Sequence, residues 1–249
     1  MAEKKRVRLT VAYDGTNYHG WQLQPNGVTI ESELNRCLSE LLGEEIQVIG
    51  ASRTDSGVHA LGNVAVFDTT ARMPADKMVY ALNQRLPEDI RIQKSEEVPA
   101  DWHPRHTASR KTYEYRIYCA KFPMPVKRLY SYFTYHELDV SSMQEAAVYL
   151  VGEHDFKSFC QTGAQVLTTV RTIHSLEVRQ EGSEIIIRVC GNGFLYNMVR
   201  IIAGTLMEVG QGRKLPRDMI RILEAKDRSA AGPTAPPQGL MLMQYEFLE

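Results

Sequence analysis

Residues 51 to 60 read Ala-Ser-Arg-Thr-Asp-Ser-Gly-Val-His-Ala and lie between two runs that are typical of strands. An apolar run at 46–49 precedes this segment, and another at 63–67 follows it. Polar side chains at the exit of a strand are a common setting for a functional site. If the backbone is extended, Arg53 and Asp55 leave on the same face, because alternate residues of a strand share a face.

A carboxylate beside a guanidinium stays ionised well below neutral pH. Asp55 could then act as a nucleophile, a base or an electrostatic stabiliser of positive charge. The same residues also suit an ordinary turn, in which Asp55 bonds its own backbone and Gly57 takes a positive φ. An Arg-x-Asp pair is usually structural, so the residues alone leave both interpretations open.

The composition is that of a globular protein with no overall basic character. The chain has 249 residues, of which 43% are hydrophobic and 24% charged, and its net charge is −1. This length suits one large domain or two of about 120 residues. Nucleic-acid binding would therefore depend on local patches of positive charge.

The cysteines and the N-terminal segment indicate a reducing compartment. Cys37, Cys119, Cys160 and Cys190 are far apart and form no Cys-x-x-Cys pair, so neither a zinc knuckle nor a disulfide framework is indicated. Cys37 lies on an apolar helical stripe and is expected in the core. No signal segment and no apolar run of membrane length is present, so we expect a cytoplasmic protein without membrane contact.

Periodicity predicts six elements in the first half of the chain. They are a strand at 6–13, a helix at 30–41, strands at 46–52 and 63–69, a helix at 74–86 and a strand at 90–97. Thr29 caps the first helix and Gly43 ends it. The order is β-α-β-β-α-β.

The second half repeats this order with one extra helix. Its elements are a strand at 112–119, a helix at 139–151, a hairpin of strands at 166–179 and 184–189, a helix at 194–209, a short helix after Pro216 and a strand at 240–247. We predict an α+β fold with two pseudo-repeated βαββαβ domains, at 1–100 and 106–249, each with an antiparallel sheet covered by helices. If the sheets meet, they form a central active-site cleft.

Two further segments mix functional residue types. Residues 102–106 and 109–115 combine cations with aromatic rings, as an RNA site requires. Spacing alone favours another interpretation, a solvated linker followed by a strand with two packed tyrosines. His103 and His106 lack a third ligand, so no metal site is predicted. Gly191 and Gly193 open a helix whose start could bind an anion, but the pattern is not that of a dinucleotide site.

Five segments resemble the motifs of A-type tRNA pseudouridine synthases, in the same order. Ser52–Ala60 is similar to the catalytic motif of that family. The other four are Tyr13–Gln22, Arg110–Tyr115, Gly193–Arg200 with Gly204-Thr205, and Ala231–Leu240. The chain departs from the family at Trp102, where Phe is frequent, and at Pro104, where Ala is frequent. Both departures concern the conformation of the linker.

The resemblance implies an enzyme that converts uridine to pseudouridine at positions 38 to 40 of the tRNA anticodon arm without a cofactor. It makes Asp55 the essential carboxylate and leaves open whether Asp55 attacks C1′ or removes a proton at C2′. Arg53 would pair with Asp55, Tyr113 would stack on the uracil, and Arg200 would add a second cation. It also implies a homodimer. Local cations are the expected phosphate contacts, namely Arg105, Arg110, Lys111, Arg213, Lys214 and Arg217.

Two other functions are compatible with parts of this pattern. A tRNA-binding protein without chemistry would tolerate loss of Asp55, and the intact Arg53–Asp55 pair argues against it. A nucleoside hydrolase or glycosylase would release free uracil, which a base-release assay detects.

Overall fold

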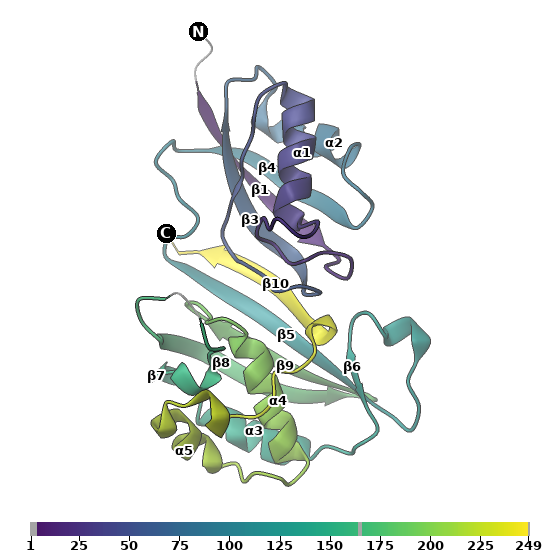
Figure 1. Ribbon diagram of the computed structural model, residues 1–249, viewed down its shortest axis with the longest axis vertical. Coiled ribbons are helices and arrows are strands. Elements are labelled where there is room, and N and C mark those ends of the chain that lie inside the picture. Colours follow the sequence, from purple (N-terminus) through teal and green to yellow (C-terminus); the bar gives the residue numbers. More distant parts are fainter. Residues whose placement is uncertain (1–3, 164–165, 249) are drawn as a thin grey trace. The chain divides into compact units, whose positions relative to one another are not determined.

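The computed structural model describes residues 4–163 and 166–248, and its fold is α+β, as the sequence predicts. The chain forms two compact units. Unit 1 comprises the described residues up to Ala108 together with those from Leu242 onward, and unit 2 is Ser109–Met241. Each unit combines a mainly antiparallel sheet with helices (Figure 1).

Unit 1 has the predicted β-α-β-β-α-β order. Its elements are β1 (Lys5–Tyr13), α1 (Ile30–Leu42), β2 (Ile49–Gly50), β3 (His59–Thr69), a 3-10 turn (Ala75–Lys77) that leads into α2 (Met78–Asn83), and β4 (Ile90–Val98). Strand β1 lies between β3 and β4 and is antiparallel to both, while the short β2 pairs with β3.

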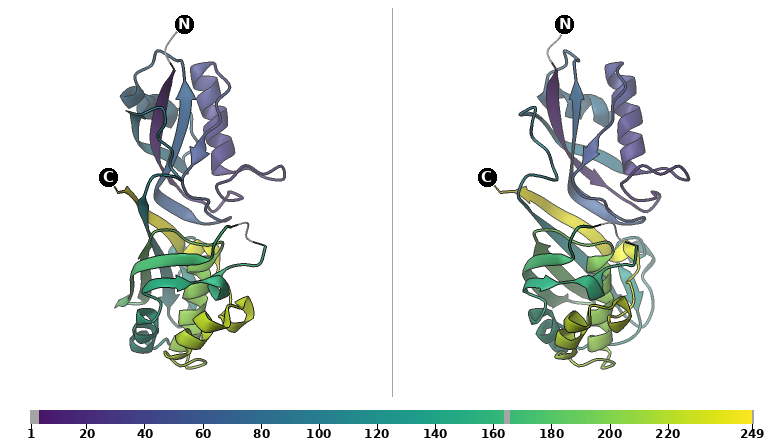
Figure 2. Two further views of the ribbon diagram at one scale, coloured as in Figure 1. Left: turned by 90° about the vertical axis from the view of Figure 1, so that its left-hand side faces the viewer. Right: turned by 60° about the vertical axis from the view of Figure 1, so that its left-hand side comes forward.

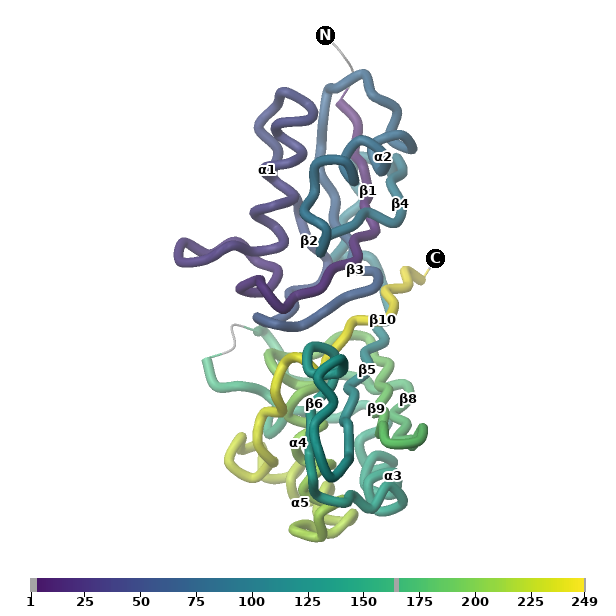
Figure 3. The backbone as a smooth tube through the Cα atoms, turned by 90° about the vertical axis from the view of Figure 1, so that its right-hand side faces the viewer, coloured from purple at the N-terminus to yellow at the C-terminus, as the bar shows by residue number. Residues whose placement is uncertain are grey.

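Alternation along β1 determines where the core of unit 1 lies. The side chains of Val7, Leu9 and Val11 are fully buried on one face of the sheet. Helices α1 and α2 cover this face (Figure 3). Helix α1 begins at a capping box in which Thr29 accepts a hydrogen bond from Ser32 N. It ends at Gly43, whose φ of 68° is the left-handed conformation expected of a C-terminal glycine.

Unit 2 contains the predicted elements and two additional short strands. Its elements are β5 (Ser109–Cys119), β6 (Tyr132–Thr134), α3 (Val140–Val148), β7 (Gly152–Asp155), β8 (Val170–Glu181), β9 (Glu184–Gly191), α4 (Met198–Gly210), α5 (Asp218–Ala225) and the start of β10 (Leu240–Phe247). The strand order is β5-β9-β8-β7, with β6 parallel to β5. Helices α3 and α4 pack against each other over this sheet (Figure 2).

The division of the chain differs from the predicted boundary at residues 100–106. Strand β10 begins in unit 2 and ends in unit 1. There Tyr245 Oη donates to the carbonyl oxygen of Pro104 at 3.1 Å, and Leu248 N donates to that of Ala108 at 2.8 Å. The apolar pattern of a strand identifies the strand but not its pairing partner, so this arrangement could not be derived from periodicity.

The cysteines are free thiols, and Cys37 is fully buried in the core, as its helical position predicts. Across residues 4–163 and 166–248, none of the helices combines the length and the apolar character that crossing a membrane requires.

Helix α4 and the segment after α5 touch backbone to backbone. A Cβ atom on Gly204 would lie 1.8 Å from the carbonyl oxygen of Pro233, and one on Gly232 would lie 2.7 Å from Thr205 Cα. Gly232 N donates to Thr205 Oγ1 at 2.9 Å. The two glycines are therefore required for the close approach of two of the five motif segments.

We expect Gly204→Ala to destabilise the protein by about 1–3 kcal/mol, because overpacking outweighs the gain in helix propensity. The measurement is urea unfolding followed by circular dichroism. Gly62→Ala on β3 is the matched control, since the nearest atom there is Thr10 Cγ2 at 3.7 Å. Equal stability of Gly204→Ala and wild type would show that the backbone contact can relax without cost.

Candidate active site

The loop between β2 and β3 turns two of its side chains inward and two outward. Ser52 and Thr54 are buried, whereas Arg53 is exposed and Asp55 is half-buried. The alternation agrees with the prediction that Arg53 and Asp55 share a face. The loop then turns sharply, as predicted, with Gly57 at a φ of 76°.

Residues of the first motif support this loop through backbone contacts. Trp21 N donates to the carbonyl oxygen of Thr54 at 3.0 Å. A Cβ atom on Gly20 would lie 2.6 Å from that same oxygen, and one on Gly15 would lie 2.0 Å from the carbonyl oxygen of Val58. Gly20 also has a φ of 82°. The first motif therefore supplies the surface on which the loop rests.

The inward side of the loop contains residues that the sequence analysis did not select. Beneath Ser52 and Thr54 lie the side chains of Tyr13 and Asn63, which are also buried. Tyr13 belongs to the first motif, and Asn63 directly precedes the apolar run Val64–Phe67 of β3. A polar residue next to a buried apolar run was the available signal, because a buried polar group requires a partner.

Arg105 lies beside this loop. Its Nε donates to the carbonyl oxygen of Gly50 at 2.8 Å, immediately before the loop begins. Burial, followed by the positive charge of Arg53, lowers the pKa of Arg105. The structure thus brings Arg53 and Arg105 near each other in unit 1.

Tyr113 lies in unit 2, on the helix-facing side of β5. It is 8% exposed, and its ring meets that of Phe194 edge to face, with the ring centroids 5.3 Å apart. Tyr115 projects on the same face, as predicted, and its hydroxyl donates to the carbonyl oxygen of Pro236 at 2.9 Å. Phe194 therefore contributes to the orientation of the Tyr113 ring.

Arg200, also in unit 2, is fixed by the protein rather than solvated. Its Nε donates to the carbonyl oxygen of Ala235 at 2.7 Å, and its NH1 donates to Asn197 Oδ1 at 2.8 Å. Asn197 precedes α4 with a φ of 60°, so the helix begins at Met198 and the prediction of a start at Phe194 is wrong. The apolar residues before Met198 continue the pattern of the helix, so periodicity did not reveal that the helix starts only after Asn197.

The other predicted phosphate contacts are spread over unit 2. Arg110, Arg213 and Arg217 are exposed and Lys111 is half-buried. Lys214 Nζ lies 3.5 Å from Glu208 Oε2.

Within the residues that the structure describes, no three His, Cys, Asp or Glu side chains gather as metal ligands would. The rings of His103 and His106 stack with their centroids 4.0 Å apart. Burial and the neighbouring charge of His106 lower the pKa of His103.

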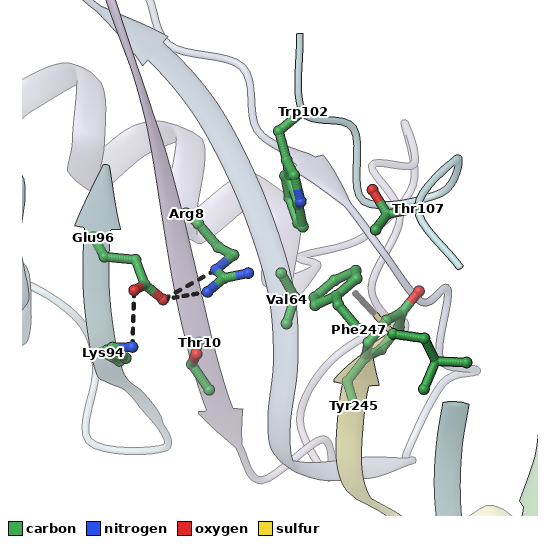
Figure 4. Close-up of a pocket in the computed structure, with 10 residues that line it drawn as sticks. Arg8, Thr10, Val64, Lys94, Glu96, Trp102, Thr107, Tyr245 and Phe247 are labelled. Carbon is green, nitrogen blue, oxygen red and sulfur yellow. Dashed lines mark hydrogen bonds and ion pairs between the residues drawn. The ribbon is translucent and has the colours of Figure 1, made fainter. Parts of the chain in front are cut away.

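A concavity of about 530 Å³ lies on the face of the unit 1 sheet that the helices leave open (Figure 4). Arg8 projects into it, donates to Glu96 Oε1 from Nε at 3.0 Å and from NH2 at 2.6 Å, and lies 5.2 Å from the centre of the Trp102 ring. Arg8 also lies over the ring of Phe247, so Trp102 and Phe247 both have a cation of the protein as their neighbour. None of the predicted site residues is among those that line this concavity.

Comparison with known families identifies the chain. The family model described as tRNA pseudouridine synthase matches residues 9–106 and 146–247. The chain therefore belongs to the tRNA pseudouridine synthase family.

Over nearly its whole length the chain is similar to proteins named tRNA pseudouridine synthase A. It is 51% identical to that of Ruminiclostridium cellulolyticum over 98% of this chain and 100% of the relative. The corresponding protein of Acetivibrio thermocellus is 48% identical and that of Caldicellulosiruptor bescii 46% identical, each over 98% of this chain and 100% of the relative.

The face of β5 opposite Tyr113 carries a buried carboxylate. Glu114 is 2% exposed, and NH1 of Arg188 and NH2 of Arg116 lie 2.6 Å and 3.0 Å from its two oxygens. Burial acts to raise the pKa of Glu114, but the hydrogen bonds from Arg188 and Arg116 outweigh it and hold the pKa below its usual value. Since the folded protein favours the ionised form, Glu114 stabilises the fold while it is ionised.

We expect Glu114→Gln to lower the free energy of unfolding near neutral pH by on the order of 3 kcal/mol, because one partner of a buried ion pair is removed. The difference from wild type should shrink as the pH falls below 4.5, the usual glutamate value, since protonation removes the same charge from the wild type. Urea unfolding from pH 7 to pH 3 measures it. The exposed Glu145, changed to Gln, is the control, and a difference independent of pH would contradict the assignment.

Proposed function

We propose that this protein converts uridine to pseudouridine in tRNA, with Asp55 as the essential carboxylate. Family membership supports the reaction. The observation that carries the assignment of Asp55 is its half-buried position on a loop that the buried side chains of Ser52 and Thr54 anchor. A carboxylate held on an anchored loop keeps a fixed position relative to a substrate, which favours electrostatic stabilisation of the reacting group.

The isomerisation balances without an external reactant. The N1–C1′ bond breaks, the uracil turns, and C5 joins C1′. The proton on C5 leaves, and N1 ends with a proton. No electrons are gained or lost, and no water is consumed, so a second carboxylate to activate water is not required.

We propose that four side chains share the work. Asp55 acts at C1′ or C2′ of the target ribose, and Arg53 pairs with it and occupies the gap left by a flipped nucleotide. Tyr113 stacks on the uracil and relays the C5 proton. Arg200 supplies a fixed positive charge, and its bonds to Ala235 and Asn197 support a positioned guanidinium rather than a mobile one.

We propose the anticodon arm of tRNA, at positions 38 to 40, as the substrate, and a cytoplasmic homodimer as the working form, on the basis of family resemblance. The cations named above are the proposed phosphate contacts. Of these, Arg105 has the best support, because it is fixed next to the Asp55 loop. Because Nε makes that bond, we propose that the two terminal nitrogens of the Arg105 guanidinium contact a phosphate.

We expect Asp55→Asn to lower turnover at least about 100-fold while tRNA binding and the thermal midpoint stay near wild type, because Asn keeps the shape but is neither nucleophile nor base. Tritium release from 5-tritiated uridine in unmodified transcripts, with mapping of the modified position, measures it. Asp76→Asn, an exposed change in unit 1, is the control. Free uracil among the products would indicate a hydrolase, and full activity of Asp55→Asn would refute the assignment.

Tyr113→Phe should bind tRNA as wild type does but react at least about 10-fold more slowly in a single turnover, because Phe keeps the stacking face and lacks the hydroxyl. Tyr135→Phe, an exposed change in unit 2, is the control. A single-turnover rate equal to that of wild type would exclude proton relay by Tyr113 and leave it a stacking role only.

A further inference from the structure

Three side chains form a hydrogen-bonded network beneath the Asp55 loop. Tyr13 Oη and Thr54 Oγ1 lie 2.7 Å apart, and Asn63 Nδ2 donates to Tyr13 Oη at 3.2 Å. Asn63 Nδ2 also donates to the carbonyl oxygen of Ser52 at 3.0 Å, and Ser52 N donates to Asn63 Oδ1 at 3.3 Å. The network joins β1, β3 and the loop.

The network is shielded from water. Asn63 is 0% exposed, Tyr13 and Ser52 are 5% exposed, and Thr54 is 7% exposed. Hydrogen bonds in such surroundings are stronger than at the surface, and a buried partner left without its bond is costly. Each member therefore constrains the others.

The contacts fix the loop on either side of Arg53 and immediately before Asp55. Asn63 holds residue 52 by both of its backbone groups, and Tyr13 holds residue 54 by its side chain. The carbonyl of Thr54, which belongs to the peptide unit that leads into Asp55, accepts from Trp21 N. The Tyr13 ring is itself oriented by Trp21, with the ring centroids 5.8 Å apart.

We infer that Tyr13 is a positioning residue for Asp55 and acts through the hydroxyl of Thr54, with Asn63 orienting the Tyr13 hydroxyl. The inference rests on the proposed role of Asp55. Because Asn63 Nδ2 can only donate, Tyr13 Oη accepts from it, and this fixes the direction from which Tyr13 meets Thr54. A displaced Thr54 would move Asp55, and a shift of about 1 Å at a reacting group can cost about 100-fold in rate.

The test removes one hydroxyl at a time with near-isosteric changes. Tyr13→Phe keeps the ring, Thr54→Val keeps the volume, and Thr54→Ser keeps the hydroxyl. Thr69→Val is the matched control, because Thr69 is a buried threonine of unit 1 at the opposite end of β3, where its hydroxyl donates to Glu44. Single-turnover rate, tRNA affinity and thermal midpoint are measured for each.

We expect Tyr13→Phe and Thr54→Val to lose about 10- to 100-fold in single-turnover rate with tRNA affinity unchanged. Thr54→Ser should retain the rate to within about 3-fold. The double variant should be no slower than the slower single variant, because both changes break one network. Thr69→Val should lose stability but not rate.

Several results would overturn the inference. These are wild-type rates in both single variants, losses that multiply in the double variant, equal losses in Thr54→Ser and Thr54→Val, or a rate loss in Thr69→Val that matches its loss of stability. Each would show that the hydroxyl pair does not set the position of Asp55.

Amide hydrogen exchange of residues 52–58 tests the positioning independently of catalysis. Exchange in this segment should be faster in Tyr13→Phe and Thr54→Val than in wild type and Thr69→Val. If wild type forms no pseudouridine, the proposed function fails, but faster exchange would still support a network that holds the loop. Unchanged exchange in both variants would refute the network even in an active enzyme.

Discussion

An extended backbone sends consecutive side chains to opposite sides, and residues 52 to 55 depend on this constraint. The two hydroxyl residues project inward and the two charged residues project outward. One short segment can thus be anchored and functional at once, because anchoring uses side chains that the substrate does not need. The glycines of the first motif complete the arrangement, since only a hydrogen atom fits where their backbone meets the loop.

The same alternation separates functions on β5 and β1. Tyr113 and Tyr115 project toward the helices of unit 2, while Glu114 between them projects to the other face and is held by arginines. On β1, Val7 and Leu9 enter the core, while Arg8 projects to the face that the helices leave open. In each strand the apolar residues fix the register, and the register then determines where the charged residues lie.

Local sequence was sufficient for features that depend on neighbouring residues. The alternation of β1, the cap at Thr29, the left-handed Gly43 and the turn at Gly57 were all predictable, because each follows from residues close in the chain. Features that depend on distant partners were not. Arg200 appears as a lone charge on a helix, and only the fold brings Ala235 to it.

Other predictions failed for the same reason or for a local one. Tyr13 and Asn63 are 50 residues apart, so their shared contact with the loop is invisible to periodicity. The start of α4 was misplaced because the apolar residues before it fit a helix, whereas the positive φ of Asn197 prevents one. The roles of Asp55, Arg53, Tyr113 and Arg200 remain predictions.

The chain passes between its two units twice, once after Ala108 and once after Met241, within strand β10. A single cut in the first connection would therefore leave the units joined. Unit 1 also cannot acquire its last strand until the whole of unit 2 has been synthesised. During translation, β3 stays without its neighbour β10 while more than a hundred residues are added. The folding of unit 1 is therefore completed only after unit 2 has been synthesised.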